Sequence, residues 1–328
     1  MGQKKDVSMS VAAPTIGSGA WRGSGELPAP VSGQRHEIGS PVGRLTYYSA
    51  APASGGNFPP LLLIHSINAA GSAYEISPLY EHYRQSRTVY ALELPGFGHS
   101  ERGKRIYTVR MMTDAILVML GEIQSVHGHG AIDALAVSLS SEFLARAVTE
   151  MPLGFRSVAL VSPTGFRSRD ATVKWRDGTR AMPWLHSLFE FPLWSEGVFR
   201  LLTSRAGIRY FLRKTWGSDQ IDLGLADYDY LTTHQPGAQH APYYFVSGYL
   251  FSQDIIRLYL SLTLPVWMAH GDRGDFVDYS NEKLVAGRAN WNIQVFATGA
   301  MPHFEAKAAF VKAYDMFLAG VPAGASPA

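Results

Sequence analysis

The sequence predicts an α/β protein with a mostly parallel sheet, helices on both faces of that sheet, and an inserted helical segment. Short apolar runs alternate with segments of helical periodicity over residues 36–163 and again over 261–320. The runs are continuous, as in strands buried on both faces. Residues 164–260 instead show helical patterns without a clear strand, and they contain Trp175, Trp184, Trp194 and Trp216. We call residues 164–260 the cap and the two flanking blocks the core.

The core pattern is one of strands and helices in alternation. Residues 43–50 (GRLTYYSA) alternate in polarity like an early strand at a sheet edge. Helices are predicted at about 106–126, after residue 138, and in the last segment before residue 320. This order implies right-handed crossovers between parallel strands. Apolar runs predict the buried strands within segments 59–65, 88–102, 132–137, 156–163, 264–280 and 292–305.

Composition excludes several classes of function. The chain has 328 residues, of which 46% are hydrophobic, enough for one large domain or a domain with a lid. The net charge of +2 arises from 29 basic and 27 acidic residues spread along the chain, so no nucleic-acid-binding face is predicted. The absence of cysteine excludes disulfides and thiolate chemistry. The histidines lack metal-binding spacing and there is no P-loop or dinucleotide motif, so we expect no metal and no cofactor.

Both ends of the chain are predicted to lie outside the packed domain. Residues 1–35 are predicted to form a mobile tail without a signal peptide, because most of this segment is rich in Gly, Ser, Ala and Pro. Residues 321–328 are predicted to form a disordered tail. No apolar run approaches the roughly 18 residues that a membrane span needs. We therefore expect a soluble, cytoplasmic protein that acts on a small molecule.

The most informative stretch is residues 131–148 (AIDALAVSLSSEFLARAV), which reads as a strand, an abrupt turn and a helix. Ser138 lies at the turn, and the residues two positions away on each side, Ala136 and Ser140, are small. Small side chains are needed there because the strand and the helix approach closely. This A-x-S-x-S string is a variant of the G-x-S-x-G nucleophile elbow. Ser140 and Ser141 are rival nucleophiles, but both are predicted to lie inside the helix.

Five motifs in the same order resemble the α/β-hydrolase superfamily over roughly residues 36–320. They are the elbow at Ser138 and the segments 65–68 (HSIN), 94–100 (LPGFGHS), 270–278 and 302–305 (PHFE). The resemblance implies the α/β-hydrolase fold with an inserted helical cap, and a catalytic triad in the chain order serine, acid, histidine. In such a triad, the histidine accepts the proton of the serine and the carboxylate orients the histidine.

The acid and the base both depart from the pattern of similar proteins. The usual acid position, three residues after a glycine, is Gly274 here, so we predict Asp275 as the acid and keep Asp272 as an alternative. The usual Gly-His-x-Pro-His reads Gly-Ala-Met-Pro-His, with Ala300 in place of the catalytic histidine. We predict that His303 serves instead. The alternative is that the triad has been lost.

The resemblance also implies an oxyanion hole made by the backbone N–H groups of Leu139 and Ile67. Ser66 replaces the glycine that usually follows His65. Candidate substrate-binding residues are Asn68 in the same loop and His240 and Tyr244 in the cap.

We therefore predict a serine hydrolase that cleaves an ester or related acyl substrate through an acyl-enzyme. A carbon–carbon bond hydrolase or lyase on the same triad is one alternative. A ligand-binding member without catalysis is the other, because Ser66 and Ala300 depart from the motifs.

Overall fold

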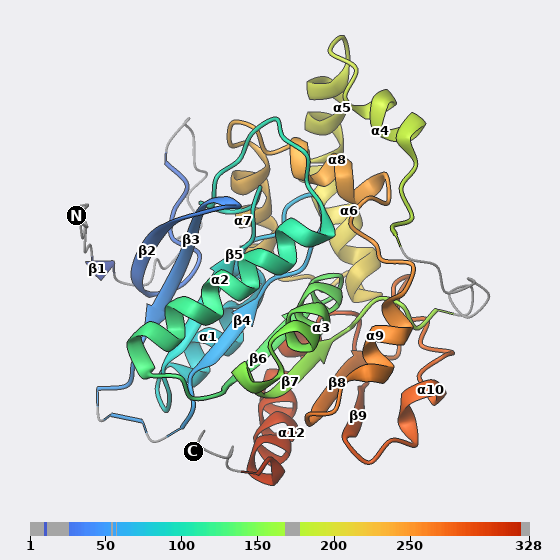
Figure 1. Ribbon diagram of the computed structural model, residues 1–328. Coiled ribbons are helices and arrows are strands. Elements are labelled where there is room, and N and C mark those ends of the chain that lie inside the picture. Colours follow the sequence, from blue (N-terminus) through green and yellow to red (C-terminus); the bar gives the residue numbers. More distant parts are fainter. Residues whose placement is uncertain (1–9, 12–25, 54, 57, 168–177, 323–328) are drawn as a thin grey trace.

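A nine-stranded, mostly parallel sheet forms the centre of the protein (Figure 1). The computed structural model describes residues 10–11, 26–53, 55–56, 58–167 and 178–322. The strand order is β1-β2-β3-β5-β4-β6-β7-β8-β9, antiparallel as far as β5 and parallel from β5 to β9. The strands are β1 (Ser10–Val11), β2 (Gly33–Ser40), β3 (Gly43–Ala50), β4 (Leu61–Ile64), β5 (Val89–Glu93), β6 (Ile132–Val137), β7 (Phe155–Val161), β8 (Val266–Gly271) and β9 (Trp291–Phe296).

Helices cover both faces of the sheet and form the cap. The helical elements are η1 (Ala73–Ile76), α1 (Ser77–Tyr83), α2 (Val109–His127), α3 (Ser140–Glu150), η2 (Pro152–Gly154), α4 (Pro183–Phe189), α5 (Ser195–Leu202), α6 (Arg205–Trp216), α7 (Leu223–Thr233), α8 (His240–Val246), α9 (Ile255–Ser261), α10 (Lys283–Ala286), α11 (Pro302–Glu305) and α12 (Lys307–Gly320). The predicted doubly wound α/β architecture is confirmed.

Successive strand residues enter two separate hydrophobic clusters because side chains alternate across a strand. In β4, Leu62 and Ile64 pack with α2 and α3, whereas Leu61 and Leu63 pack with α1 and α12. Both faces of the central strands are therefore buried, which explains their continuous apolar runs.

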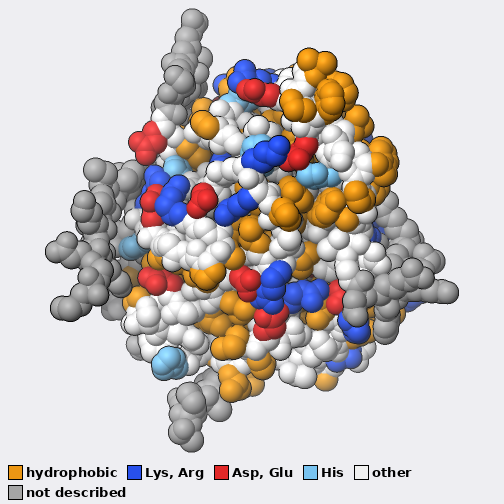
Figure 2. Space-filling model, turned by 45° about the horizontal axis from the view of Figure 1, so that its top comes forward, with side chains coloured by type: hydrophobic (Ala, Val, Ile, Leu, Met, Phe, Trp, Pro, Cys, Tyr) orange, Lys and Arg blue, Asp and Glu red, His pale blue; other side chains and the backbone are white. Residues whose placement is uncertain are grey.

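The cap packs against the core unevenly. Ile255, Ile256 and Tyr259 of α9 belong to the same buried cluster as α2 and α3. Helices α4 and α5 expose several large apolar side chains, among them Trp184 and Leu201. Figure 2 shows hydrophobic side chains gathered at the top of the molecule, where α4 and α5 lie in Figure 1. Residues 255–259 therefore pack against the core, as do Tyr244 and Leu250 earlier in the cap. The predicted bounds of the cap, 164–260, stay a prediction.

The predicted boundary of the N-terminal tail is corrected. Strand β2 begins at Gly33, and Leu27 and Val31 before it are buried. The backbone carbonyl of Pro28 accepts a hydrogen bond from the Tyr228 hydroxyl of α7 at 2.8 Å. Isolated apolar residues among Gly and Pro gave no periodicity from which this packing could be predicted. Most of the predicted tails, residues 1–9, 12–25 and 323–328, lie outside the described residues.

None of the helices in the described part of the chain combines the length and the apolar character needed to span a bilayer.

Candidate active site at the carboxyl ends of the strands

Ser138 lies at a sharp turn between β6 and α3, as predicted. Its φ of 55° is in the left-handed region, which non-glycine residues seldom adopt. The Ser138 N–H donates to the carbonyl of Val161 in β7 at 2.7 Å, which holds the turn against the neighbouring strand. Strained backbone of this kind persists where the surrounding structure enforces it, and it is concentrated at functional sites.

The two rival serines have structural roles. The Ser140 hydroxyl donates to the backbone carbonyl of His65 at 2.6 Å, and the Ser141 hydroxyl donates to the carbonyl of Ala136 at 3.3 Å. Both serines are fully buried. Ser138 is partly exposed, and its hydroxyl has no hydrogen-bond partner within the described chain. Of the three, Ser138 alone is available to a substrate.

The two N–H groups predicted to form an oxyanion hole have no acceptor among the described residues. Leu139 begins the turn into α3, and Ile67 lies in the loop after β4. A buried N–H without an acceptor is rare in folded proteins, and acyl-transfer sites are a known place for it.

The loop after β4 is held by two buried side chains. The Nε2 atom of His65 accepts from the Leu94 N–H at 3.0 Å, so Nδ1 carries the ring proton and donates to the Ser66 carbonyl. Burial lowers the pKa of His65, which agrees with a neutral ring. On the other side, the carboxylate of Glu75 in η1 accepts from the Ser66 N–H at 2.7 Å.

The predicted base, His303, is fully buried at the start of α11. Its Nε2 atom donates to the backbone carbonyl of Glu75 at 2.7 Å, which leaves Nδ1 unprotonated. Nδ1 has no partner within the described residues. Burial lowers the pKa of His303 to about 4, so the ring is neutral at pH 7. The structure shows no hydrogen bond between this ring and Ser138.

Neither predicted acid orients His303 in this structure, and this corrects the predicted contact. The Asp275 carboxylate forms an ion pair with Lys214 of α6, and its side chain is 55% exposed. Asp272 is also exposed, and its backbone N–H bonds to Thr298. Sequence position alone placed both aspartates after β8, but the loop turns their side chains outward to solvent and to the cap.

The C-terminal turn of α6 lies against the loops that follow β8 and β9. The carbonyl of Thr215 accepts from the Ala300 N–H at 2.8 Å, and the carbonyl of Trp216 accepts from Arg273 Nε at 3.1 Å. A Cβ atom on Gly299 would lie 2.4 Å from both of those carbonyl oxygens. The usual positions of the base and the acid therefore contact a helix of the cap.

The fold is similar to that of known proteins. The model of the alpha/beta hydrolase fold family matches residues 59–189. A probable hydrolytic enzyme from Pseudomonas aeruginosa PAO1 superposes with a TM-score of 0.68 at 16% identity, over 87% of this chain and 93% of that one. The enol-lactonase from Burkholderia xenovorans LB400 superposes with a TM-score of 0.65 at 16% identity, over 87% and 100%.

This chain has the α/β-hydrolase fold. A meta-cleavage product hydrolase from Pseudomonas fluorescens IP01 is similar as well, with a TM-score of 0.62 at 17% identity over 88% of this chain and 98% of that one. A search of curated protein sequences finds no match. The predicted resemblance to the α/β-hydrolases is confirmed, and at these identities the similar structures show the fold alone.

Two of the three predicted substrate-binding residues, Asn68 and Tyr244, contact other parts of the protein. The Asn68 amide donates to Ser66 Oγ and to Glu75, and its oxygen accepts from the Ala70 N–H, so Asn68 closes its own loop. Tyr244 packs against the ring of Tyr107 from the core, with ring centroids 5.7 Å apart. His240 lies on the same helix, α8, and its Nδ1 has no partner among the described residues. Their contact with a substrate stays a prediction.

Two buried carboxyl groups, one in α3 and one in α7, could not be recognised from the sequence. Glu142 of α3 accepts from Thr164 Oγ1 at 2.5 Å and from the Ser252 N–H at 2.8 Å, and burial raises its pKa to about 7. Asp229 of α7 is buried, and one of its oxygens has no partner within the described chain. Burial, together with the charge of Glu75, raises the pKa of Asp229 well above its usual value.

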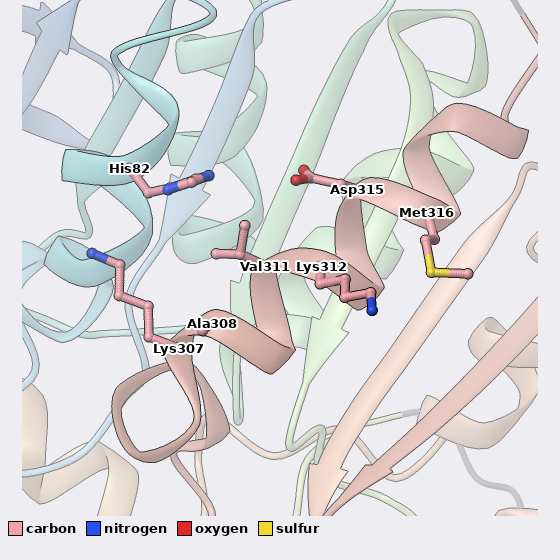
Figure 3. A pocket seen from close by; sticks show the side chains of 7 residues that line it. All are labelled: His82, Lys307, Ala308, Val311, Lys312, Asp315 and Met316. Atoms are coloured by element: carbon pink, nitrogen blue, oxygen red, sulfur yellow. The ribbon is translucent and has the colours of Figure 1, made fainter.

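A surface recess of about 690 Å³ lies away from these residues, between α1 and α12. Figure 3 shows His82 of α1 facing the recess, with the other lining side chains coming from α12. It shares no residue with the elbow. The described residues hold no cluster of three or more potential metal ligands.

Proposed function

We propose that this α/β-hydrolase cleaves a carboxylic ester or a related acyl compound through an acyl-enzyme at Ser138. The observation that carries this proposal is the left-handed conformation of Ser138 at the end of β6, where its hydroxyl has no hydrogen-bond partner among the described residues. In the described part of the chain, the N–H of Leu139, which follows the turn, and that of Ile67, in the loop bonded to α3 through Ser140, have no acceptor. This combination supports attack on a carbonyl whose oxygen becomes negatively charged.

His303 is the proposed base. A base must be unprotonated at working pH. The pKa of His303 is lowered, and its Nδ1 carries no proton and has no partner in the part of the chain that the structure describes. The carbonyl of Glu75 fixes the tautomer, a role that an aspartate usually has. Because Ser138 and His303 are not hydrogen-bonded here, the reaction requires a rearrangement that brings Nδ1 within reach of Ser138 Oγ. In the present arrangement neither Asp275 nor Asp272 can act as the acid. One of them would do so only if the rearrangement also turned the loop after β8.

A second candidate function, ligand binding without turnover, is favoured by the contact between α6 and the two loops. The residues at the usual acid and base positions, Gly274 and Ala300, have no ionisable side chain, and backbone atoms of α6 contact both. A serine without a base is a poor nucleophile. The region around Ser138 would then bind a ligand without cleaving it.

Labelling with a fluorophosphonate and turnover of acyl esters of increasing chain length distinguish the two candidates. We expect the label on Ser138 of the wild-type protein and none on Ser138→Ala. We expect His303→Gln to lower turnover at least about a thousandfold, as removal of a triad member does. His82→Gln, in the recess on α1, is the matched control and should retain activity. An unlabelled wild-type protein that turns over none of the esters would overturn the hydrolase proposal and leave the binding function.

A further inference from the structure

The buried carboxylate of Glu75 lies at the centre of the loop that contains Ile67. Its Oε2 atom accepts from the Ser66 N–H at 2.7 Å. Its Oε1 atom accepts from Ser66 Oγ at 3.1 Å and from the Asn68 side-chain amide at 2.5 Å. The side chain is almost inaccessible to solvent. A buried carboxylate that accepts three hydrogen bonds forms stronger bonds than a neutral acceptor would.

These donors lie immediately before and after Ile67. Ser66 is therefore held through its main chain and its side chain, and Asn68 is held through its side chain. A separate bond, from Ser140 Oγ to the His65 carbonyl, joins the same loop to the helix that follows the elbow. With both neighbours of Ile67 fixed and the loop tied to α3, the Ile67 N–H has one direction relative to Ser138.

We propose that Glu75 is a positioning residue that holds the Ile67 N–H in place as an oxyanion donor. This inference rests on the proposed function of Ser138. It also accounts for Ser66 in place of the usual glycine, because the Ser66 hydroxyl supplies one of the three bonds to Glu75. The Glu75 carbonyl, which accepts from His303 Nε2, links the same residue to the proposed base.

Glu75→Gln tests the role of the carboxylate with almost no change in shape. An amide has only one acceptor oxygen, so its NH₂ group must face at least one of the three donors. We expect kcat for oxygen esters to fall about tenfold to a hundredfold with KM nearly unchanged, because a misdirected oxyanion donor weakens transition-state binding. The matching thionoesters should lose less, because a thiocarbonyl sulfur accepts hydrogen bonds weakly.

Glu81→Gln is a matched control outside the site. The Glu81 carboxylate of α1 accepts from the N–H and the Oγ of Ser32, each at 2.8 Å, as Glu75 does from Ser66. We expect this variant to keep the wild-type ratio of oxygen-ester to thionoester turnover. Equal losses on both substrate types in Glu75→Gln, or the same change in Glu81→Gln, would show a general loss of structure and overturn the proposal.

Hydrogen–deuterium exchange tests the same role without catalysis. In a Ser138→Ala background, Glu75→Gln should increase exchange of a peptide that contains residues 65–70, and Glu81→Gln should not. Unchanged exchange would overturn the positioning role even if Ser138 is active. If the wild-type protein is neither labelled nor active, the hydrolase proposal fails. Increased exchange would then still show that Glu75 holds the loop, although no oxyanion donor would be involved.

Discussion

Burial shifts the pKa values of two ionisable residues, Glu142 and His303, in opposite directions. Burial raises the pKa of Glu142 to about 7 and lowers that of His303 to about 4. In each case burial disfavours the charged form, which is negative for a carboxylate and positive for an imidazole. The folded protein therefore holds a proton on Glu142 longer than the unfolded chain does, and it resists protonation of His303.

The two residues predict opposite slopes of stability with pH. The contribution of Glu142 to the free energy of unfolding is greatest below pH 4.5. It is lost as pH rises to about 7, because the Glu142 carboxyl ionises at lower pH in the unfolded chain than in the folded protein. The contribution of His303 is present above pH 6.5 and is lost as pH falls towards 4. Each change is about 3 kcal/mol, at 1.36 kcal/mol for one pKa unit. Between pH 4.5 and 6.5 the two slopes offset each other in the wild-type protein.

Glu142→Gln should make the slope of His303 visible. We expect the free energy of unfolding of this variant to fall by about 3 kcal/mol between pH 6.5 and 4, relative to the wild-type profile. Urea unfolding at fixed ionic strength across pH 4–8 measures it, with His303→Gln expected to show the reverse slope. A Glu142→Gln profile parallel to that of the wild type would contradict the expected behaviour of Glu142.

At the scale of elements, the C-terminal turn of α6 decides how the site is covered. Helix α6 ends at Trp216, and the next residue, Gly217, has a left-handed φ of 58°, as is common after a helix. A Cβ on Gly217 would lie 2.8 Å from the Cα of Gly274. The glycine that stands where similar proteins have an acid therefore allows the cap to approach closely.

Gly217→Ala should separate α6 from the loop after β8. We expect it to cost at least about 2 kcal/mol more than Gly55→Ala, measured by urea unfolding, and to increase proteolysis between α6 and α7. Gly55 has a comparable φ of 68° and nothing within 4 Å of an added Cβ, so that control measures the backbone strain alone. Equal costs for the two variants would show that the contact contributes little.

At the scale of the whole molecule, a buried ion-pair network and the candidate site lie at opposite ends of β6. Asp133, near the start of the strand, is fully buried and accepts from Arg87, Arg156 and Ser157. Arg87 also donates to the carbonyl of Pro59 at the start of the β4 segment. This network joins the amino-terminal ends of several strands, whereas Ser138 follows the carboxyl end of β6.

Asp133→Asn should destabilise the protein without altering the elbow. We expect a loss of about 3–5 kcal/mol, because two buried guanidinium groups lose their counter-charge. The rate of fluorophosphonate labelling at low temperature should stay close to that of the wild type. Asp114→Asn, which removes an exposed pair with Arg110, is the control and should cost less than about 1 kcal/mol. A change in labelling rate in the folded Asp133→Asn protein would show that the two ends of β6 are coupled.

The strands, most helices and the elbow could be predicted because their signals are local. The run from Ile132 to Val137 and the small residues around Ser138 lie within a few positions of each other, and their periodicity follows from backbone geometry. The tail boundary could not be predicted, because Leu27 and Val31 are buried only through contacts with distant segments.

The sequence by itself determined the α/β architecture and the serine at the turn. Only the tertiary structure decided the surroundings of that serine: that Asp275 pairs with Lys214, that His303 bonds to Glu75, and that α6 contacts Gly274 and Ala300. The physical reason is how far apart in the chain the residues that specify each feature lie. A turn is specified by neighbours in the chain, whereas the direction of a side chain in a loop depends on which distant element packs against it.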